Sequence, residues 1–491
     1  MPDTAENPGK PFRCPTELHT FPSPKQRLGA LNMDWSDKDI EFEEKKMFED
    51  AVSDIENALK YAEHIGADET EIIYAMKKAT IINFKTDAIE TARCSTNVGY
   101  GIRSVLNKAV GFSGTNIKSS LNDCVKSALE SAKIMGPDPN FKNLPQSSKY
   151  TPVDGLYDER IIQMSIEDCI EKAMEMVAGA EDVKGIVPTS GSFSRSLSYV
   201  LIMNSNGVFA KKRGTGFSGY VDVITKEDAG SGDASTAYDY KVSRSKDIDF
   251  YKIGQNAGFL AQKSAKGVMI QPSKLPVIFH PFAFSDIIEN TFASSIDADN
   301  VQKGRSGLIG KLQERIGTEE LSIIDDGTLP GGIGSGSFDD EGTATQKTSV
   351  VENGILKSYL YDSYTAGKDG VKSTGNGFRN SYASVPTVDI SNLIIQYPKS
   401  DILAETKNGI YIHTVIGAHT ANEISGDFSV EGRNAFIIEN GELKTPVKSI
   451  MISGNIFDVL SKIDGAGADV QKVGNIVTPS VRISEMSVIG N

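Results

Sequence analysis

The sequence has few cysteines for its 491 residues and no long apolar run. Its four cysteines, Cys14, Cys94, Cys124 and Cys169, stand far apart and form no C-x-x-C pair. That spacing argues against a zinc ribbon or a thioredoxin-type redox site, and it is typical of free intracellular thiols. No stretch approaches the roughly 18 apolar residues of a membrane helix. The first residues also lack the basic start and apolar core of a secretory signal. We therefore expect a soluble protein of the cytoplasm.

Histidine is also scarce. The five histidines are His19, His64, His280, His413 and His419. No H-x-x-x-H or H-E-x-x-H spacing occurs, although a helical zinc site needs two rings on one face. An extended strand would hold His413 and His419 about 20 Å apart. We therefore predict that this chain binds no metal by itself.

Acidic residues outnumber basic ones and give a formal net charge of −14. Such a surface repels DNA, RNA and anionic membranes. The basic clusters are short; one is Lys211-Lys212-Arg213. The composition thus predicts neither a nucleic-acid nor a membrane partner.

Length and patterning predict three folded units behind a tail, since domains usually hold about 100–200 residues. Residues 1–45 are rich in proline and poor in apolar residues, which predicts a flexible tail. The units then span 46–150, 151–268 and 269–491. The unit 46–150 ends in a stretch rich in proline and serine, and the unit 269–491 is rich in glycine.

The units mix helices and strands, so the predicted fold class is α+β, with an N-terminal helix/strand unit and a middle β-rich unit. Apolar residues spaced three and four apart predict helices. These helices fall at 47–62, 121–135, 159–178 and 247–265. Strand-like runs occur at 71–76, 80–84, 98–105, 109–112, 196–203 and 220–226. Asn206-Gly207 predicts a type I′ turn, in which both residues take positive φ.

The last unit is predicted to be a glycine-rich, mixed sheet domain. It opens with a buried strand at 275–279 and a helix at 282–294. The core stripe of that helix is Phe284, Ile287, Ile288 and Phe292. Two similar segments, 350–358 and 437–445, each hold an Asn-Gly turn between strands. They predict matching hairpins at related places in one sheet.

Carboxylates flank the glycine loop at 331–336. Asp325 and Asp326 precede it, and Asp339 and Glu341 follow it. Clustered carboxylates can bind a metal or act as acid and base, whereas Asp side chains also cap turns. The loop does not match a phosphate cradle, because no Lys follows it. A chemical role and a structural role both stay open for these carboxylates.

Several segments, taken together, resemble a known family. They are 299–306, 325–332, 338–342, 351–354, 361–366, 373–376, 417–422 and 426–429. In this order and spacing the chain resembles the TldD/PmbA family, also called modulator of DNA gyrase, over about residues 47–490. The resemblance implies an α+β fold and zinc metallopeptidase activity, that is, proteolysis of unfolded or extended peptides. It further implies that a TldD-type subunit, with H-E-x-x-x-H and a distant cysteine, pairs with a PmbA-type (TldE) subunit.

This sequence departs from the zinc motif of the family at every position. Glu289 and Ser294 stand where the motif has histidine, and Asn290 replaces the general-base Glu. The stretch 469–474, which should supply the cysteine, has none. One carboxylate does not hold zinc, because three protein ligands are usual. The resemblance therefore implies a PmbA/TldE-type chain without catalytic residues or cofactor of its own, with zinc in a TldD-type partner.

Such a chain would hold an extended peptide and present it to the zinc of its partner. The candidate groove residues are Asp339, Glu341, His419, Asn422, Asp427 and Ser429. Glycine-rich backbone suits the role, because it lets a peptide strand approach closely. One alternative is a non-catalytic homodimer that binds peptides or proteins. Another is a self-sufficient hydrolase built on Asp339 and Glu341 with an added metal.

Overall fold

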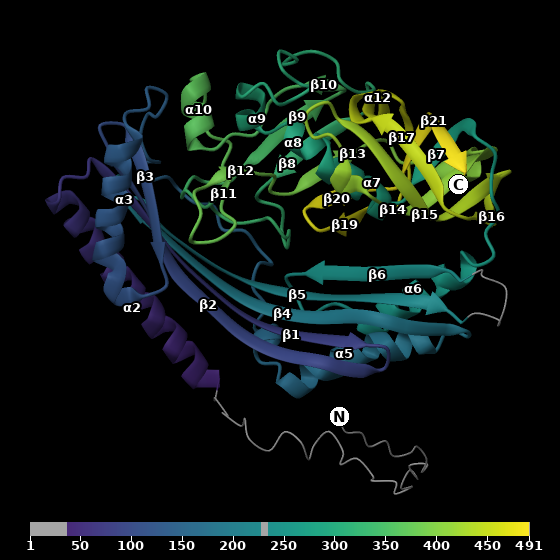
Figure 1. Cartoon of the computed structure of the whole chain (residues 1–491), viewed down its shortest axis with the longest axis horizontal. Helices are drawn as coiled ribbons and strands as arrows, with labels where there is room; N and C mark the ends of the chain where they lie inside the picture. Colours follow the sequence, from purple (N-terminus) through teal and green to yellow (C-terminus); the bar gives the residue numbers. More distant parts are fainter. Residues whose placement is uncertain (1–36, 227–233, 491) are drawn as a thin grey trace, which may run out of the picture. The chain divides into compact units, whose positions relative to one another are not determined.

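The computed structural model describes residues 37–226 and 234–490 (Figure 1). The chain divides after Glu49 into two units, and the fold given below is that of the second, Asp50–Asn491. Residues 1–36 of the predicted tail lie outside the described residues. Helix α2 (Asp37–His64) begins well before the apolar stripe that predicts it. Its first residues are rich in Glu and Lys, which favour helix without needing an apolar face.

One antiparallel sheet of six strands joins the predicted N-terminal and middle units. In spatial order its strands are β3 (Ala109–Thr115), β2 (Ala88–Leu106), β1 (Glu69–Lys85), β4 (Ile186–Asn204), β5 (Phe209–Thr225) and β6 (Thr236–Ser243). The two units meet where β1 pairs with β4. The predicted runs 71–76 and 80–84 form a single strand, because the polar residues between them pair in register with β2 and β4.

Helices cover parts of this sheet. They are α3 (Leu121–Met135), after the short 3-10 turn η1 (Lys118–Ser120), then α4 (Glu159–Ile162), α5 (Ile166–Glu181) and α6 (Phe250–Lys263). The single helix predicted at 159–178 is wrong. A capping box formed by Ser165 and Asp168 starts a new helix there, because these side chains satisfy backbone N–H groups at a helix start. Helices α5 and α6 pack on each other and on the sheet.

The turn between β4 and β5 differs from the predicted type I′ turn. Only Gly207 takes a positive φ, and Asn206 does not. The Asn204 side chain accepts hydrogen bonds from the N–H groups of Asn206 and Val208, both at 2.9 Å. This side-chain bonding holds a longer loop in place of the two-residue turn.

Two further sheets form most of the C-terminal region. The first contains β10 (Ile355–Leu356), β9 (Lys347–Glu352), β8 (Ser322–Asp326), β13 (Leu393–Gln396), β20 (Ile476–Thr478) and β19 (Gln471–Val473). The second contains β14 (Asn408–Ile416), β7 (Ser273–Phe279), β21 (Val481–Gly490), β17 (Ile450–Asn455), β15 (Asp427–Glu439) and β16 (Glu442–Val447), with β18 (Ile463–Ala466) paired to β21. Its strand order closes on itself, because β14 also pairs with β15.

The remaining elements are short. They are β11 (Gly377–Phe378), β12 (Thr387–Val388), α7 (Pro281–Asn290), α8 (Phe292–Ser295), α9 (Ala298–Gln302), α10 (Ser363–Asp369), α11 (Ile402–Glu405), η2 (Ala418–Thr420) and α12 (Ile456–Ser461). The helix predicted at 282–294 is interrupted at Thr291, whose φ and ψ are −133° and −65°. Its four predicted core residues are all buried.

The two Asn-Gly hairpins form as predicted, with positive φ at Asn353 and Gly354 and at Asn440 and Gly441. Their predicted placement in one sheet is wrong, because β9–β10 and β15–β16 belong to different sheets. Turn chemistry fixes a hairpin locally but does not select the sheet that it joins. The predicted α+β class is confirmed, and no described helix is long and apolar enough to cross a membrane.

Candidate functional site

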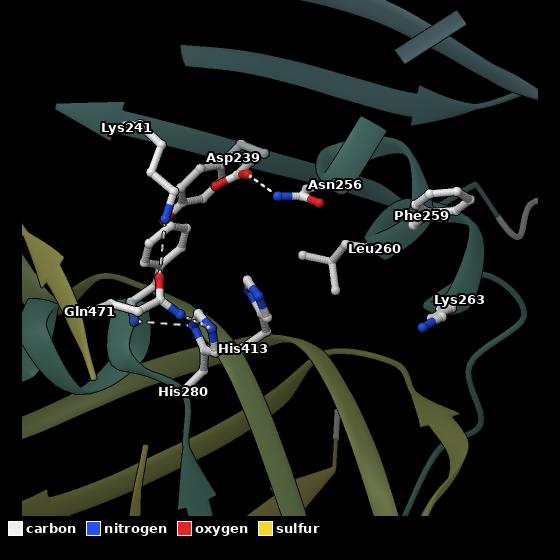
Figure 2. Close-up of a pocket in the computed structure, with 11 residues that line it drawn as sticks. Asp239, Lys241, Asn256, Phe259, Leu260, Lys263, His280, His413 and Gln471 are labelled. Carbon is white, nitrogen blue, oxygen red and sulfur yellow. Dashed lines mark hydrogen bonds between the residues drawn. The ribbon is translucent and has the colours of Figure 1, made fainter. Parts of the chain in front are cut away.

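A cavity of about 620 Å³ lies where β6 and α6 face α7, β14 and β19 (Figure 2). Its volume falls within the range of small-molecule sites. Residues from five parts of the chain line it: Tyr238, Asp239, Lys241, Asn256, Phe259, Leu260, Lys263, His280, Phe282, His413 and Gln471. The cavity is therefore built jointly by the middle and C-terminal segments.

Two stacked histidines lie on one side of the cavity. Strands β7 and β14 run parallel with Phe279 opposite Ile412, so the residues that follow each of them are neighbours. The rings of His280 and His413 have centroids 3.9 Å apart and planes 14° apart. Burial, and then the charge of Lys241, lowers the pKa of His280 to about 4. Burial and the neighbouring ring also lower the pKa of His413, so both imidazoles are neutral at neutral pH.

The tautomer of His280 follows from its position at the start of α7. Its Nδ1 accepts a hydrogen bond from the N–H of Phe282 at 3.2 Å, which caps the helix. A neutral imidazole carries one proton, so the proton of His280 lies on Nε2. That N–H points to Gln471, whose side-chain nitrogen is 3.1 Å away. Nδ1 of His280 therefore caps α7, and its Nε2–H faces Gln471 in the cavity wall.

Charged groups occupy the opposite side. Lys241 donates to Oε1 of Gln471 at 3.3 Å. Asp239 accepts from the amide of Asn256 at 3.0 Å, and burial raises the pKa of its carboxyl. Figure 2 shows the Lys241 side chain directed toward Gln471, and the Asp239 and Asn256 side chains directed toward each other. The site thus combines neutral imidazoles, an ammonium and a buried carboxyl.

The positions of the family's zinc motif lie on α7 and α8. Glu289 is exposed to solvent. The protein around its carboxyl removes part of its hydration, and this loss, followed by the charges of Asp286 and Asp389, raises its pKa. Asn290 donates to the carbonyl of Asp286 at 2.8 Å. Ser294 donates to the carbonyl of Thr291 at 3.0 Å. Only one of the three motif positions thus offers an anionic donor.

These side chains do not fit a zinc ion. Zinc takes thiolate, imidazole or carboxylate ligands, usually three from the protein. Across the described parts of the chain, no three His, Cys, Asp or Glu side chains gather in a group that could hold a metal. Gln471, in the stretch where the family's cysteine is expected, lines the cavity instead.

Asp339 and Glu341 are fully buried and bound to other parts of the fold. Glu341 accepts from Arg103 at 2.9 Å and from the backbone and hydroxyl of Ser363, both at 2.7 Å. Arg103 also bonds Glu71 at 2.8 Å, so the cluster ties the large sheet to the C-terminal region. Asp339 accepts three backbone hydrogen bonds. In this structure neither carboxylate is accessible to a peptide or to an added metal.

The other four candidate groove residues lie on one exposed edge. His419 is in η2, which packs against α7. Burial raises the pKa of Asp286 on that helix, and the charge of His419 partly opposes the rise. Asn422 accepts from two N–H groups of its own turn. Asp427 accepts from Ser425 at 2.7 Å and from Asn455 at 2.9 Å. Ser429 is exposed on β15. None of these four residues lines the cavity.

The cavity residues were not singled out from the sequence. Parallel register between β7 and β14 brings His280 beside His413, and nothing in the local pattern around either residue encodes that register. The one usable signal is His280-Pro281 directly after an apolar strand. Proline favours the first position of a helix, so the histidine is expected at the cap.

The fold and the cavity define an α+β protein in which the six-stranded sheet and the C-terminal region together line one cavity. Sequence comparison identifies the class of protein. Residues 70–132, 159–265 and 272–490 match domain 1, the central domain and the C-terminal domain of the PmbA/TldA metallopeptidases. The chain belongs to the PmbA/TldD family.

Individual relatives agree with that assignment. An uncharacterized protein of Methanocaldococcus jannaschii is 34% identical over 87% of this chain and 98% of its own length. A metalloprotease PmbA homolog of Buchnera aphidicola is 29% identical over 92% of this chain and 99% of its own.

Solved structures share the fold. A Thermotoga maritima protein, named as a candidate modulator of a DNA gyrase, is 26% identical, with a TM-score of 0.82 over 89% of this chain and 99% of that chain. TldE from Thermococcus kodakarensis, 24% identical, has the same fold with a TM-score of 0.81 over 89% of this chain and 100% of its own. The family relationship supports a role in peptidase chemistry at the level of the family.

Proposed function

We propose that this chain is the zinc-free, PmbA/TldE-type subunit of a two-subunit peptidase. A TldD-type partner would supply the zinc, and this chain would help to hold an unfolded or extended peptide. The observation that carries the proposal is the donor set at the zinc-motif positions. It offers one exposed carboxylate, Glu289, beside an amide and a hydroxyl that bond to neighbouring backbone carbonyls.

The residues of this chain would bind and position the peptide. The cavity supplies hydrogen-bond donors from Lys241, His280 and Gln471 and one buried carboxyl, that of Asp239. The exposed edge formed by His419, Asn422, Asp427 and Ser429 is a second candidate surface for the peptide or the partner. The zinc and the groups that transfer protons would belong to the partner, and the residues of this chain would bind and orient the peptide.

The test is reconstitution with a TldD-type partner. The two chains would be purified separately and mixed, and bound zinc and cleavage of an unfolded peptide would then be measured. We expect little zinc on this chain alone, zinc on the partner, and strong cleavage only in the mixture. Glu289→Gln should leave the zinc content of the complex unchanged, because that carboxylate alone cannot hold the ion.

Two results would contradict the proposal. Stoichiometric zinc on the isolated chain, with matching cleavage, would make it a self-sufficient hydrolase. If the partner cleaves the peptide equally well without this chain, this chain does not contribute to the cleavage. Peptide binding by a homodimer, without cleavage in any mixture, would instead support the non-catalytic alternative.

A further inference from the structure

The cavity holds more hydrogen-bond donors than acceptors. Gln471 lies between Lys241 and His280, and its oxygen can face only one of them. With that oxygen toward Lys241, the amide nitrogen meets the protonated Nε2 of His280 at 3.1 Å. With the amide reversed, its N–H groups would face the ammonium instead. In either orientation the side chain of Gln471 can accept from only one of these two donors, and the other donor is left facing the cavity.

His413 increases this excess of donors. Its Nδ1 is buried and has no hydrogen-bond partner among the described residues. An unpaired lone pair is tolerated better than an unpaired buried N–H, so the proton is expected on Nε2. No described residue accepts a hydrogen bond from that Nε2. The stacked pair therefore offers two neutral N–H donors, and that of His280 lies beside Gln471.

The rest of the wall is apolar and aromatic. Tyr238 and Phe282 line the cavity with parallel rings whose centroids are 6.2 Å apart, and Tyr240, outside the lining, stacks on Phe282 at 4.9 Å. Leu260 and Phe259 face the cavity from α6. A fitting ligand therefore carries an apolar group next to a group that only accepts hydrogen bonds.

The positive charge of the cavity indicates that the hydrogen-bond acceptor of the ligand is an anion. Lys241 and Lys263 both line the cavity, and its one acid, Asp239, already accepts from Asn256 and from the N–H of Tyr240. A carboxylate has two oxygens and no donor, and it gains most from an ammonium and N–H groups together.

We propose that the cavity binds a carboxylate attached to an apolar or aromatic group. Lys241, Gln471 and the two histidines hold the oxygens, and Phe282 and Leu260 contact the apolar part. If the chain acts as proposed above, the natural source of this carboxylate is the C-terminal residue of a peptide. That last step rests on the proposed function, whereas binding of the carboxylate does not.

Calorimetric titration of the full chain, without a partner, tests the site. The probes are N-acetyl-L-phenylalanine and its neutral analogue, N-acetyl-L-phenylalanine amide. We expect the acid to bind at least about tenfold more tightly than the amide, because hydrogen bonds to a charged group are the stronger ones. Lys241→Met and Gln471→Glu should each weaken binding of the acid by about tenfold or more.

Lys252→Met is the matched control, since it removes the same charge from an exposed position of α6 outside the cavity. It should leave the affinity unchanged, and circular dichroism would check that each variant is folded. Equal binding of acid and amide, no binding of either at millimolar concentration, or tighter binding of inorganic phosphate would overturn the proposal. Because no partner is present, these results are independent of whether the two-subunit peptidase forms.

Discussion

Replacing Glu341 by glutamine should destabilise the protein strongly, because this carboxylate joins the two halves of the fold. Glu341 is fully buried and pairs with Arg103 at 2.9 Å and with the hydroxyl and N–H of Ser363 at 2.7 Å. Glutamine keeps one oxygen and places an NH₂ group against either Arg103 or the N–H of Ser363. Both orientations lose an acceptor and leave the guanidinium with less compensating charge.

The magnitude follows from burial and from two opposing effects. Removing one partner of a buried ion pair costs about 3–5 kcal/mol. Arg103 keeps its bond to Glu71, at 2.8 Å, which limits the loss. Burial, and then the charge of Glu341, raises the pKa of Asp339, so the substitution also relieves that repulsion. We therefore expect a net loss of about 2–4 kcal/mol, a large share of the roughly 5–15 kcal/mol that stabilises a typical domain.

Urea unfolding followed by circular dichroism and by tyrosine fluorescence would measure this loss, provided that the two transitions coincide. The matched control is Glu314→Gln, which removes the exposed partner of Lys311 in an ion pair of 2.7 Å. The control should stay within about 0.5 kcal/mol of the parent. If Glu341→Gln behaves like the control, the cluster does not join the sheets energetically.

The loss should also depend on pH. Burial would raise the pKa of Glu341, but the charge of Arg103 and the bonds from Ser363 outweigh it and hold this pKa below the ordinary value. A carboxyl with a lowered pKa stabilises the fold above its ordinary pKa, and this contribution is lost as the pH falls through the folded value. The difference between parent and variant should therefore stay nearly constant from pH 7 to about pH 5 and shrink as the pH falls further below about 4, the ordinary value for Glu. A difference that stays constant down to about pH 3 would refute the electrostatic cause.

Two further variants test other parts of the fold. Burial raises the pKa of Asp297 to about 7, so its favourable contribution is full below about pH 4 and is lost as the pH rises through 7. In Asp297→Asn the asparagine side chain still caps α9. Thermal unfolding should show this variant to be about 1–3 kcal/mol more stable than the parent at pH 8, and no more stable than the parent near pH 4. An equal change in stability at both pH values would refute this. Gly254→Ala should cost at least about 1–3 kcal/mol, although alanine normally favours a helix, because its Cβ would lie 1.9 Å from the Met176 carbonyl on α5; a neutral or stabilising change would contradict that contact.

The sequence pattern predicted those elements whose structure depends on residues close to one another in the chain. The core face of α7, the long α3 helix and the positive φ of Asn353 and Asn440 all follow from residue type and spacing. Pairings between distant segments could not be predicted in this way. Nothing near Glu71 indicates that it meets Arg103 and Arg379, and no apolar run predicts that β1 pairs with β4.

The same difference separates the two readings of Asp339 and Glu341. From the sequence alone, two carboxylates beside a glycine loop could act in acid-base chemistry or could stabilise the fold. Burial within the fold distinguishes these readings, because Glu341 acquires a guanidinium partner from a strand more than two hundred residues earlier in the chain. The cavity is the opposite case, since His280 and His413 look unrelated in the sequence and become a functional candidate only through strand register.

Thr291 interrupts the helix that carries the three positions of the family's zinc motif. Residues 289 and 294 are five apart, and in a regular α-helix their side chains would point about 140° away from each other. Two ligands at this spacing therefore need a break in the helix, and this chain has one between α7 and α8. At this break Thr291 donates its hydroxyl to the carbonyl of Ile287 at 2.5 Å. What the chain lacks is thus suitable donor atoms at Glu289, Asn290 and Ser294, and not an interruption of the helix between them.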